Sequence, residues 1–305
     1  MNFKQVEKAR EAYHEKLRTA TIVSLVISAV LTIMILGGSG SFFLGLFGAA
    51  FIFLFVTATA YIITSFTASK EATAYRDAYK TYFVEQNLRQ NFADLHYDRN
   101  AGLDHSIVGA TGMIDTGDAY HSNDFATGKY KDVAFTQADV HIQERHTDSE
   151  GHTTYVTTFR GRMMIFEFPK KFNFKLELIG RKFRAYRIPR GTVKGRELSQ
   201  IDTESSEFNE MFRIYAEDGF EAFYLLDPAT ILKLQTIAEK HKCRILFGFI
   251  DNKLLIALND GKDSFEPPKP NQKINEKEEL EKVSEDIKVI TDFVDQLSLN
   301  RKLFK

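Results

Sequence analysis

Few residues of this chain lie in a pattern that could perform chemistry. The best placed are His146 and His152, on either side of a turn expected at Asp148-Ser149-Glu150-Gly151. If that hairpin is centred on Ser149, the two histidines face each other across it. Imidazoles with nearby carboxylates suit a divalent metal ion. An exposed polar hairpin tip explains the same residues, and two ligands on a loop make a weak site, so we predict no metal there.

The usual catalytic motifs are missing from the sequence. It has no Gly-rich phosphate loop, no His-Glu-x-x-His, no paired cysteines and no Gly-x-Ser-x-Gly elbow. Cys243 is the single cysteine, which excludes an internal disulfide and is typical of a small buried apolar residue. We therefore predict no catalytic residue and no cofactor.

Charge is the clearest compositional anomaly. Residues 170–196 are strongly basic, whereas residues 197–221 are strongly acidic, and the whole chain has a net charge of −1. The basic block could face anionic lipid headgroups, where each basic residue contributes about 1 kcal/mol. The two blocks could equally lie side by side and neutralise each other. The acidic block and the net charge argue against nucleic acid. The candidate lipid or anion contacts are Arg181, Lys182, Arg184, Arg187 and Arg190.

A long uncharged stretch must position the rest of the chain. From Thr19 to Ser69 there is no Asp, Glu, Lys, Arg or His. A membrane-spanning helix needs about 20 apolar residues, so this stretch is long enough for two. The turn chemistry of residues 37–41 divides it into spans at Thr19–Leu36 and Phe42–Ser69. Both flanks are basic and the turn is not, which predicts that both termini are cytoplasmic.

The segments on either side of this hairpin read as helices. Residues 1–18 form one, and residues 70–97 continue the second span as a juxtamembrane helix. From 98 to 268 the pattern becomes that of a mostly antiparallel β domain with one packed helix, Pro228–His241, capped by Asp227. The chain is thus an α+β membrane protein. The expected strands are His105–Met113, Val133–Thr147, Thr153–Phe168, Phe174–Ile179, Phe212–Ala216, Phe220–Leu225, Arg244–Ile250 and Lys253–Leu258.

The last segment, 269–305, follows a proline-rich linker and contains an amphipathic helix. Its apolar residues recur at alternating steps of three and four, which is a heptad seam that needs a partner. The partner is either the two helices at 3–17 and 75–82, in a short bundle, or a second copy of the chain. The seam residues are Leu280, Val283, Ile287, Ile290, Val294 and Leu297.

Several short motifs together resemble an uncharacterised family of bacterial membrane proteins, domain-of-unknown-function family 3137 (DUF3137). They are residues 158–162 (TFRGR), 207–212 (EFNEMF), 221–228 (EAFYLLDP), 249–254 (FIDNKL) and 265–267 (FEP). The resemblance covers the hairpin and the domain to about Pro267 and leaves the heptad tail outside. It implies two N-terminal spans in a bacterial inner membrane and a cytosolic domain, and it supplies no catalytic residues.

The resulting prediction is a membrane-anchored cytosolic module that works by binding, as a scaffold for a partner protein, a second copy or the lipid surface. The alternative is an enzyme that acts on a membrane-borne or phosphorylated substrate. A compact cleft with convergent acids and bases would favour the enzyme, and a flat face or open groove would favour the binding module.

Overall fold

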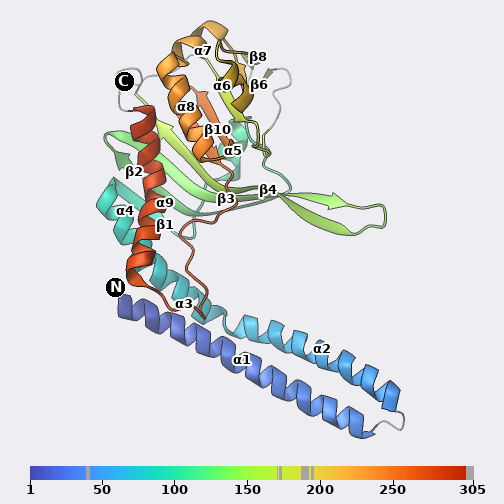
Figure 1. Cartoon of the computed structure of the whole chain (residues 1–305). Coiled ribbons are helices and arrows are strands. Elements are labelled where there is room, and N and C mark those ends of the chain that lie inside the picture. Colours follow the sequence, from blue (N-terminus) through green and yellow to red (C-terminus); the bar gives the residue numbers. More distant parts are fainter. Residues whose placement is uncertain (39–41, 170, 172–173, 187–191, 194–195, 300–305) are drawn as a thin grey trace. The chain divides into compact units, whose positions relative to one another are not determined.

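The computed structural model describes residues 1–38, 42–169, 171, 174–186, 192–193 and 196–299 (Figure 1). The chain divides into two compact units, and each is described here by itself. The helical unit contains residues 1–86 and 266–281. The sheet unit contains residues 87–265 and the chain from 282 onward.

Two long helices dominate the helical unit. They are α1 (Phe3–Gly38) and α2 (Phe42–Thr67), and they lie side by side, with the hydroxyls of Ser28 and Thr57 2.9 Å apart. The N-terminal helix and the first expected span are therefore one continuous helix. It extends through Gly38, two residues into the expected turn, whose residues 39–41 lie outside the described part of the chain.

The second long helix gives way to shorter ones. After a break at Ala68 come α3 (Ser69–Tyr79), a π-helical segment η1 (Lys80–Glu85) and α4 (Gln86–Asn91). Helix ends at Asn91, because β1 (Ala93–Asp98) pairs with a neighbouring strand. The expectation of helix through residue 97 is therefore wrong over its last residues.

The proline-rich segment after the sheet is fixed to the helices of its own unit. The guanidinium of Arg10 donates to the carbonyl of Pro270 at 2.6 Å, and the Tyr75 hydroxyl donates to that of Pro268 at 3.0 Å. Lys80, which is buried, pairs with Glu266 at 2.7 Å. The segment expected to be a spacer is thus held by hydrogen bonds along α1 and α3.

The sheet unit is built on nine antiparallel strands in the order β1-β2-β3-β4-β11-β10-β5-β9-β8. Besides β1, these are β2 (Ala119–Tyr130), β3 (Val133–Thr147), β4 (Thr153–Glu167), β5 (Leu176–Gly180), β8 (Ser199–Ile201), β9 (Phe212–Ala216), β10 (Ile245–Ile250) and β11 (Lys253–Leu258). A separate pair joins β6 (Thr192–Val193) and β7 (Arg196–Glu197). The antiparallel sheet and the mixed α+β class are confirmed.

Among the described residues between 98 and 268, four helices and not one accompany the sheet: α5 (His105–Ala110), α6 (Ser206–Met211), α7 (Gly219–Leu225) and α8 (Pro228–Lys240). The predicted α8 is confirmed, with the Asp227 side chain accepting from the Thr230 amide. The strands predicted at His105–Met113 and Phe220–Leu225 are wrong. Asp104 and Asp218 each accept hydrogen bonds from amides of the following turn, which starts a helix instead.

Alternation along the strands gives the sheet two apolar faces. On β10, Leu246 belongs to a buried cluster with Val108 of α5, whereas its neighbour Phe247 contacts Phe212 and Phe293 on the other side. That second side is covered by α8 and by α9 (Glu276–Leu297), as Figure 1 shows. The sheet is therefore a central layer between helices.

The apolar face of the heptad helix α9 is buried in the sheet unit. From Lys282 onward it belongs to that unit, and five of the six seam residues, all except Leu280, are buried there. Phe293 also stacks on His241 with ring centroids 6.0 Å apart.

The predicted bundle is present in part. Tyr13 of α1 and Tyr75 of α3 contact each other with ring centroids 6.4 Å apart, and the Tyr79 hydroxyl donates to Glu279 at the start of α9 at 2.6 Å. From Val283 onward, however, the seam is buried in the sheet unit and not against those helices.

Strands β3 and β4 continue beyond their neighbours. The pairing of β2 with β3 stops at Gln143, and that of β11 with β4 stops at Arg162. Beyond Gln143 and Thr157 the two strands pair only with each other, and Figure 1 shows this hairpin arm (144–156) projecting from the sheet.

Candidate functional site

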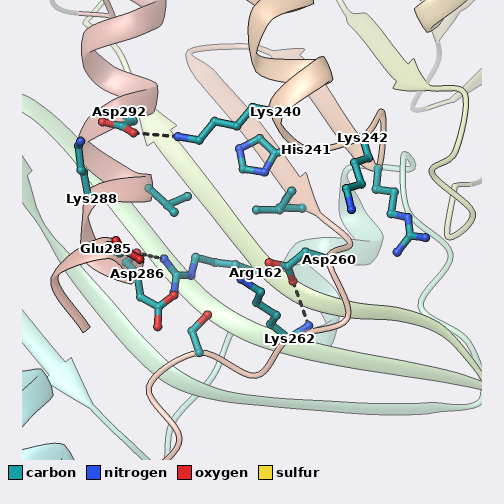
Figure 2. Close-up of a pocket in the computed structure, with 14 residues that line it drawn as sticks. Arg162, Lys240, His241, Lys242, Asp260, Lys262, Glu285, Asp286, Lys288 and Asp292 are labelled. Atoms are coloured by element: carbon teal, nitrogen blue, oxygen red, sulfur yellow. Dashed lines mark hydrogen bonds and ion pairs between the residues drawn. The ribbon is translucent and has the colours of Figure 1, made fainter. Parts of the chain in front are cut away.

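A cavity of about 580 Å³ lies in the sheet unit, and Figure 2 shows the side chains around it. Four separate segments form its walls: β4, the end of α8 with the turn into β10, the end of β11 with the loop that follows, and α9. The volume is in the range of small-molecule sites. The lining residues are Arg162, Lys240, His241, Lys242, Arg244, Leu258, Asp260, Lys262, Ser264, Glu285, Asp286, Lys288, Val289 and Asp292.

Arg162 of β4 is the most deeply placed charge of the cavity, with its side chain only 3% exposed. Its Nη1 donates to the backbone carbonyl of Asp286, and its guanidinium lies 5.0 Å from the ring centre of Phe265. Its Nε lies 3.7 Å from Oδ1 of Asp139, too far for a hydrogen bond, and neither atom has another partner. The charge of Arg162 is therefore balanced, but its hydrogen-bonding capacity is not filled.

The counter-charge, Asp139 of β3, is buried as well. Its Oδ2 accepts from the Ser264 amide at 2.6 Å. Burial raises the pKa of Asp139 well above its usual value, and the nearby charge of Arg162 opposes that rise. Arg162 thus favours the ionised form of the Asp139 carboxyl, whereas burial favours the protonated form.

A run of basic residues after α8 forms one wall. Lys242 and Cys243 both adopt positive φ, of 54°, and the Cys243 amide donates to the Ala238 carbonyl at 2.7 Å. This left-handed turn ends the helix and brings Lys242 to the rim of the cavity (Figure 2), which Arg244 also lines. Both side chains are exposed.

His241 separates this wall from the sheet. It is partly buried against Phe293, and burial, with Lys240 next, lowers its pKa. The imidazole is therefore neutral at pH 7 and offers a hydrogen bond without adding charge.

The opposite wall is one side of α9 and carries three carboxylates. Asp292 forms an ion pair with Lys240, with Oδ2 and Nζ 3.1 Å apart. Asp286 is partly buried, and burial raises the pKa of its carboxyl. Its carboxylate has no hydrogen bond or direct ion pair with another described residue, but the charges of Arg162, Lys262 and Lys282 act on it and oppose the rise in its pKa. Glu285 beside it is exposed.

The described residues of the predicted basic block do not line this cavity. Arg181, Lys182 and Arg184 are exposed, and Arg181 donates to the Asn209 carbonyl at 2.8 Å. Arg187 and Arg190 lie outside the described residues. No observation tests the predicted lipid contact, which stays a prediction.

The histidines of the hairpin arm are not brought opposite each other. The register pairs His146 with Thr154 and Thr147 with Thr153, so the hairpin is centred on Glu150 and not on Ser149. His146 lies 3.6 Å from Glu144, and His152 lies 3.3 Å from Asp148. Each histidine therefore has a local acidic neighbour at an exposed tip.

The basic run at Lys240-His241-Lys242-Cys243-Arg244 was the signal in the sequence that could have indicated the cavity. It follows a well-predicted helix and precedes a well-predicted strand. The acidic wall gave no comparable signal, because charged residues on the outer side of an amphipathic helix are ordinary.

Comparison with known families addresses the region that contains the cavity. Residues 157–299 match the family described as protein of unknown function (DUF3137). The resemblance is confirmed for that region. It differs in extent from the expectation, since the matched DUF3137 region includes the heptad helix and does not include α1 or α2. Every residue that lines the cavity lies within it.

Other comparisons add little. No curated protein matches the chain. A solved structure, that of the mycobacterial trehalose monomycolate transport factor A (TtfA), is similar with 9% identity and a TM-score of 0.37. That match covers 73% of this chain and 95% of the other. A likeness of this size does not bear on function.

Proposed function

We propose that this protein is a membrane-anchored module whose sheet unit binds an anionic ligand in the charged cavity. The observation that best supports this proposal is the set of basic side chains that line the cavity. Lys242, Arg244, Lys262 and Lys288 line it without an ion pair to another described residue, and Arg162 lies at its base. Six basic residues against four acidic ones favour a ligand with negative charge.

The surface of the long helices supports the anchor. Along α1, Ile22, Val26 and Ile33 are exposed, whereas Ser24 and Ser28 are buried. Small polar residues inside and large apolar residues outside are typical of helices packed in lipid. The described stretch Phe3–Met34 is also long and apolar enough to cross a membrane. Water would leave this apolar surface unsatisfied, and a bilayer would cover it.

The finer topology belongs to the same proposal. α2 supplies a second span, both termini are cytoplasmic, and the sheet unit lies in the cytosol of a bacterium. This topology rests on the uncharged stretch from Thr19 to Ser69, which is flanked by basic residues on both sides. The exposed Arg181, Lys182 and Arg184 are then available to lipid headgroups or to a partner protein.

The cavity does bring acids and bases together, the arrangement expected of an enzyme. Its best-placed groups are occupied with each other, however. Lys240 pairs with Asp292, and Arg162 is tied to Asp139 and to the backbone of Asp286. The charged side chains at the centre of the cavity are paired with one another, and basic side chains without an ion pair lie at its rim. This arrangement supports binding as the function.

The anchor predicts how the protein fractionates. We expect the full-length chain to remain with membranes after washes in high salt and in alkaline carbonate, because apolar helices are held by the hydrocarbon core. The high-salt wash distinguishes such an anchor from electrostatic attachment through basic patches, because salt screens the attraction between basic side chains and lipid headgroups. Release of the chain by carbonate would contradict the anchor.

The anion site predicts a charge-reversal effect. Lys242→Glu with Arg244→Glu should weaken the binding of pyrophosphate to the full-length protein in detergent by at least about tenfold, since a hydrogen bond to a charged group contributes about 1.5–3 kcal/mol. Isothermal titration calorimetry measures this directly.

The matched control reverses two exposed bases of the basic block, Lys182→Glu with Arg184→Glu. It changes the net charge equally and should leave pyrophosphate affinity unchanged. Equal loss in both variants would assign the effect to overall charge and would contradict the cavity as the site.

A further inference from the structure

The cavity presents charges of both signs. Figure 2 shows Lys242 after α8 and Lys262 with Asp260 after β11, whereas Glu285, Asp286 and Lys288 project from α9; Arg244 also lines the cavity. A site built only for an anion would not keep carboxylates at its wall, because they repel the ligand. The presence of both acidic and basic side chains in the cavity therefore indicates a ligand that itself carries both charges.

Asp286 is the decisive residue of the acidic wall. It is partly buried, yet neither it nor Glu285 has a side-chain hydrogen bond or ion pair with another described residue. Arg162 binds the carbonyl of Asp286, and the charges of Arg162, Lys262 and Lys282 act on the Asp286 carboxylate without a hydrogen bond to it. A partly buried carboxylate that accepts no hydrogen bond is costly, and an ammonium group in the cavity would donate one.

The basic wall lacks partners in the same way. Lys242, Arg244 and Lys262 make no ion pair with another described residue, whereas Lys240 and Asp292 neutralise each other at 3.1 Å where the two walls meet. Charges of both signs without a direct ion pair thus remain around a hollow of about 580 Å³. That volume can hold a small molecule with a charged group at each end.

We propose that the ligand is a zwitterion, with a phosphate at the Lys242–Arg244 wall and a primary ammonium group at Asp286 and Glu285. This inference rests on the proposed function, since it refines which anion the cavity binds. Phosphate accepts several charge-assisted hydrogen bonds from lysine and arginine, and an ammonium group donates up to three to carboxylates. A free aminoalkyl phosphate and a lipid headgroup of that kind share this chemistry.

The test compares three probes on the full-length protein in detergent by calorimetry: O-phosphoethanolamine, inorganic phosphate and ethanolamine. We expect phosphoethanolamine to bind about tenfold or more tightly than phosphate, because only it engages both walls. Asp286→Asn should lower phosphoethanolamine affinity to the level of phosphate and leave phosphate binding unchanged or improved. Asp295→Asn is the matched control, because Asp295 also lies on α9 but is not among the lining residues and pairs instead with Lys131.

The outcomes separate the inference from the proposed function. If phosphate binds as tightly as phosphoethanolamine, or if Asp286→Asn lowers both equally, the zwitterion is wrong while the anion site stands. If neither phosphate compound binds, the proposed anion site is itself wrong.

A second arm assigns the source of the zwitterion. The protein is placed in nanodiscs of phosphatidylglycerol, with and without phosphatidylethanolamine. Competition by phosphatidylethanolamine against soluble phosphoethanolamine supports a lipid headgroup as the ligand. Unchanged affinity in both discs supports a free small molecule.

Discussion

Arg162→Met is expected to destabilise the sheet unit by about 3–5 kcal/mol, which is the usual cost of leaving one buried charge of a pair alone. Asp139 would remain 2% exposed with a single hydrogen bond, from Ser264. The measurement is unfolding of the full-length protein in detergent, followed by near-ultraviolet circular dichroism.

The effect has a defined pH dependence. Burial already raises the pKa of Asp139, and removal of Arg162 raises it further. A carboxyl with a raised folded-state pKa contributes stability below its unfolded pKa and loses it as pH rises through the folded pKa. The deficit of the variant should therefore be largest at alkaline pH and shrink on acidification.

The control replaces both partners, Arg162→Met with Asp139→Leu. Removing both charges leaves nothing uncompensated, so most of the lost stability should return. A double variant as unstable as the single one would mean that packing, such as the contact of Arg162 with Phe265, carries the effect.

Gly161→Ala is expected to lower the free energy of unfolding by a comparable amount, about 4 kcal/mol. Gly161 of β4 has φ of 154°, and an added Cβ would lie 2.0 Å from the carbonyl oxygen of Leu258 on β11. That oxygen belongs to the backbone of a paired strand and cannot move without opening the sheet. Such steric and backbone conflicts are among the few causes of large single-residue effects.

Gly109→Ala is the comparison for this change. Gly109 lies in α5, where an added Cβ would only touch a Thr116 methyl at 3.9 Å. Alanine also favours helix more than glycine does, so stability should be unchanged or slightly higher. A mild effect at Gly161 in the same assay would mean that β4 and β11 can separate locally.

Elements whose local signals agree with their packing could be predicted from the sequence. α8 has both an Asp cap and a proline at its start, and β3 coincides with the predicted Val133–Thr147. β2 could not be predicted, because Ser, Asn, Asp and Gly interrupt its apolar pattern and it becomes a strand only between β1 and β3. At α5 and α7 the caps Asp104 and Asp218 were present but outweighed by short apolar runs.

The cavity was beyond reach for a different reason. Arg162 is followed by almost eighty residues before Lys240, and Asp286 lies further still along the chain. Their meeting depends on β11 pairing next to β4 and on α9 packing across the sheet. No periodicity in the sequence encodes that order of strands. Sequence analysis therefore identified the basic block, whose charged residues are close together in the sequence. It missed the cavity, whose charged residues come together only in the folded chain.

The hairpin arm has a consequence for how such chains can vary over evolution. Its two strands pair only with each other, from Glu144 opposite Val156 to Thr147 opposite Thr153. Removing or adding one residue on each strand, opposite one another, shortens or lengthens the arm while the sheet keeps its pairing. The arm is thus free to change length in matched steps, and the matched family region begins where it rejoins the sheet, at Thr157.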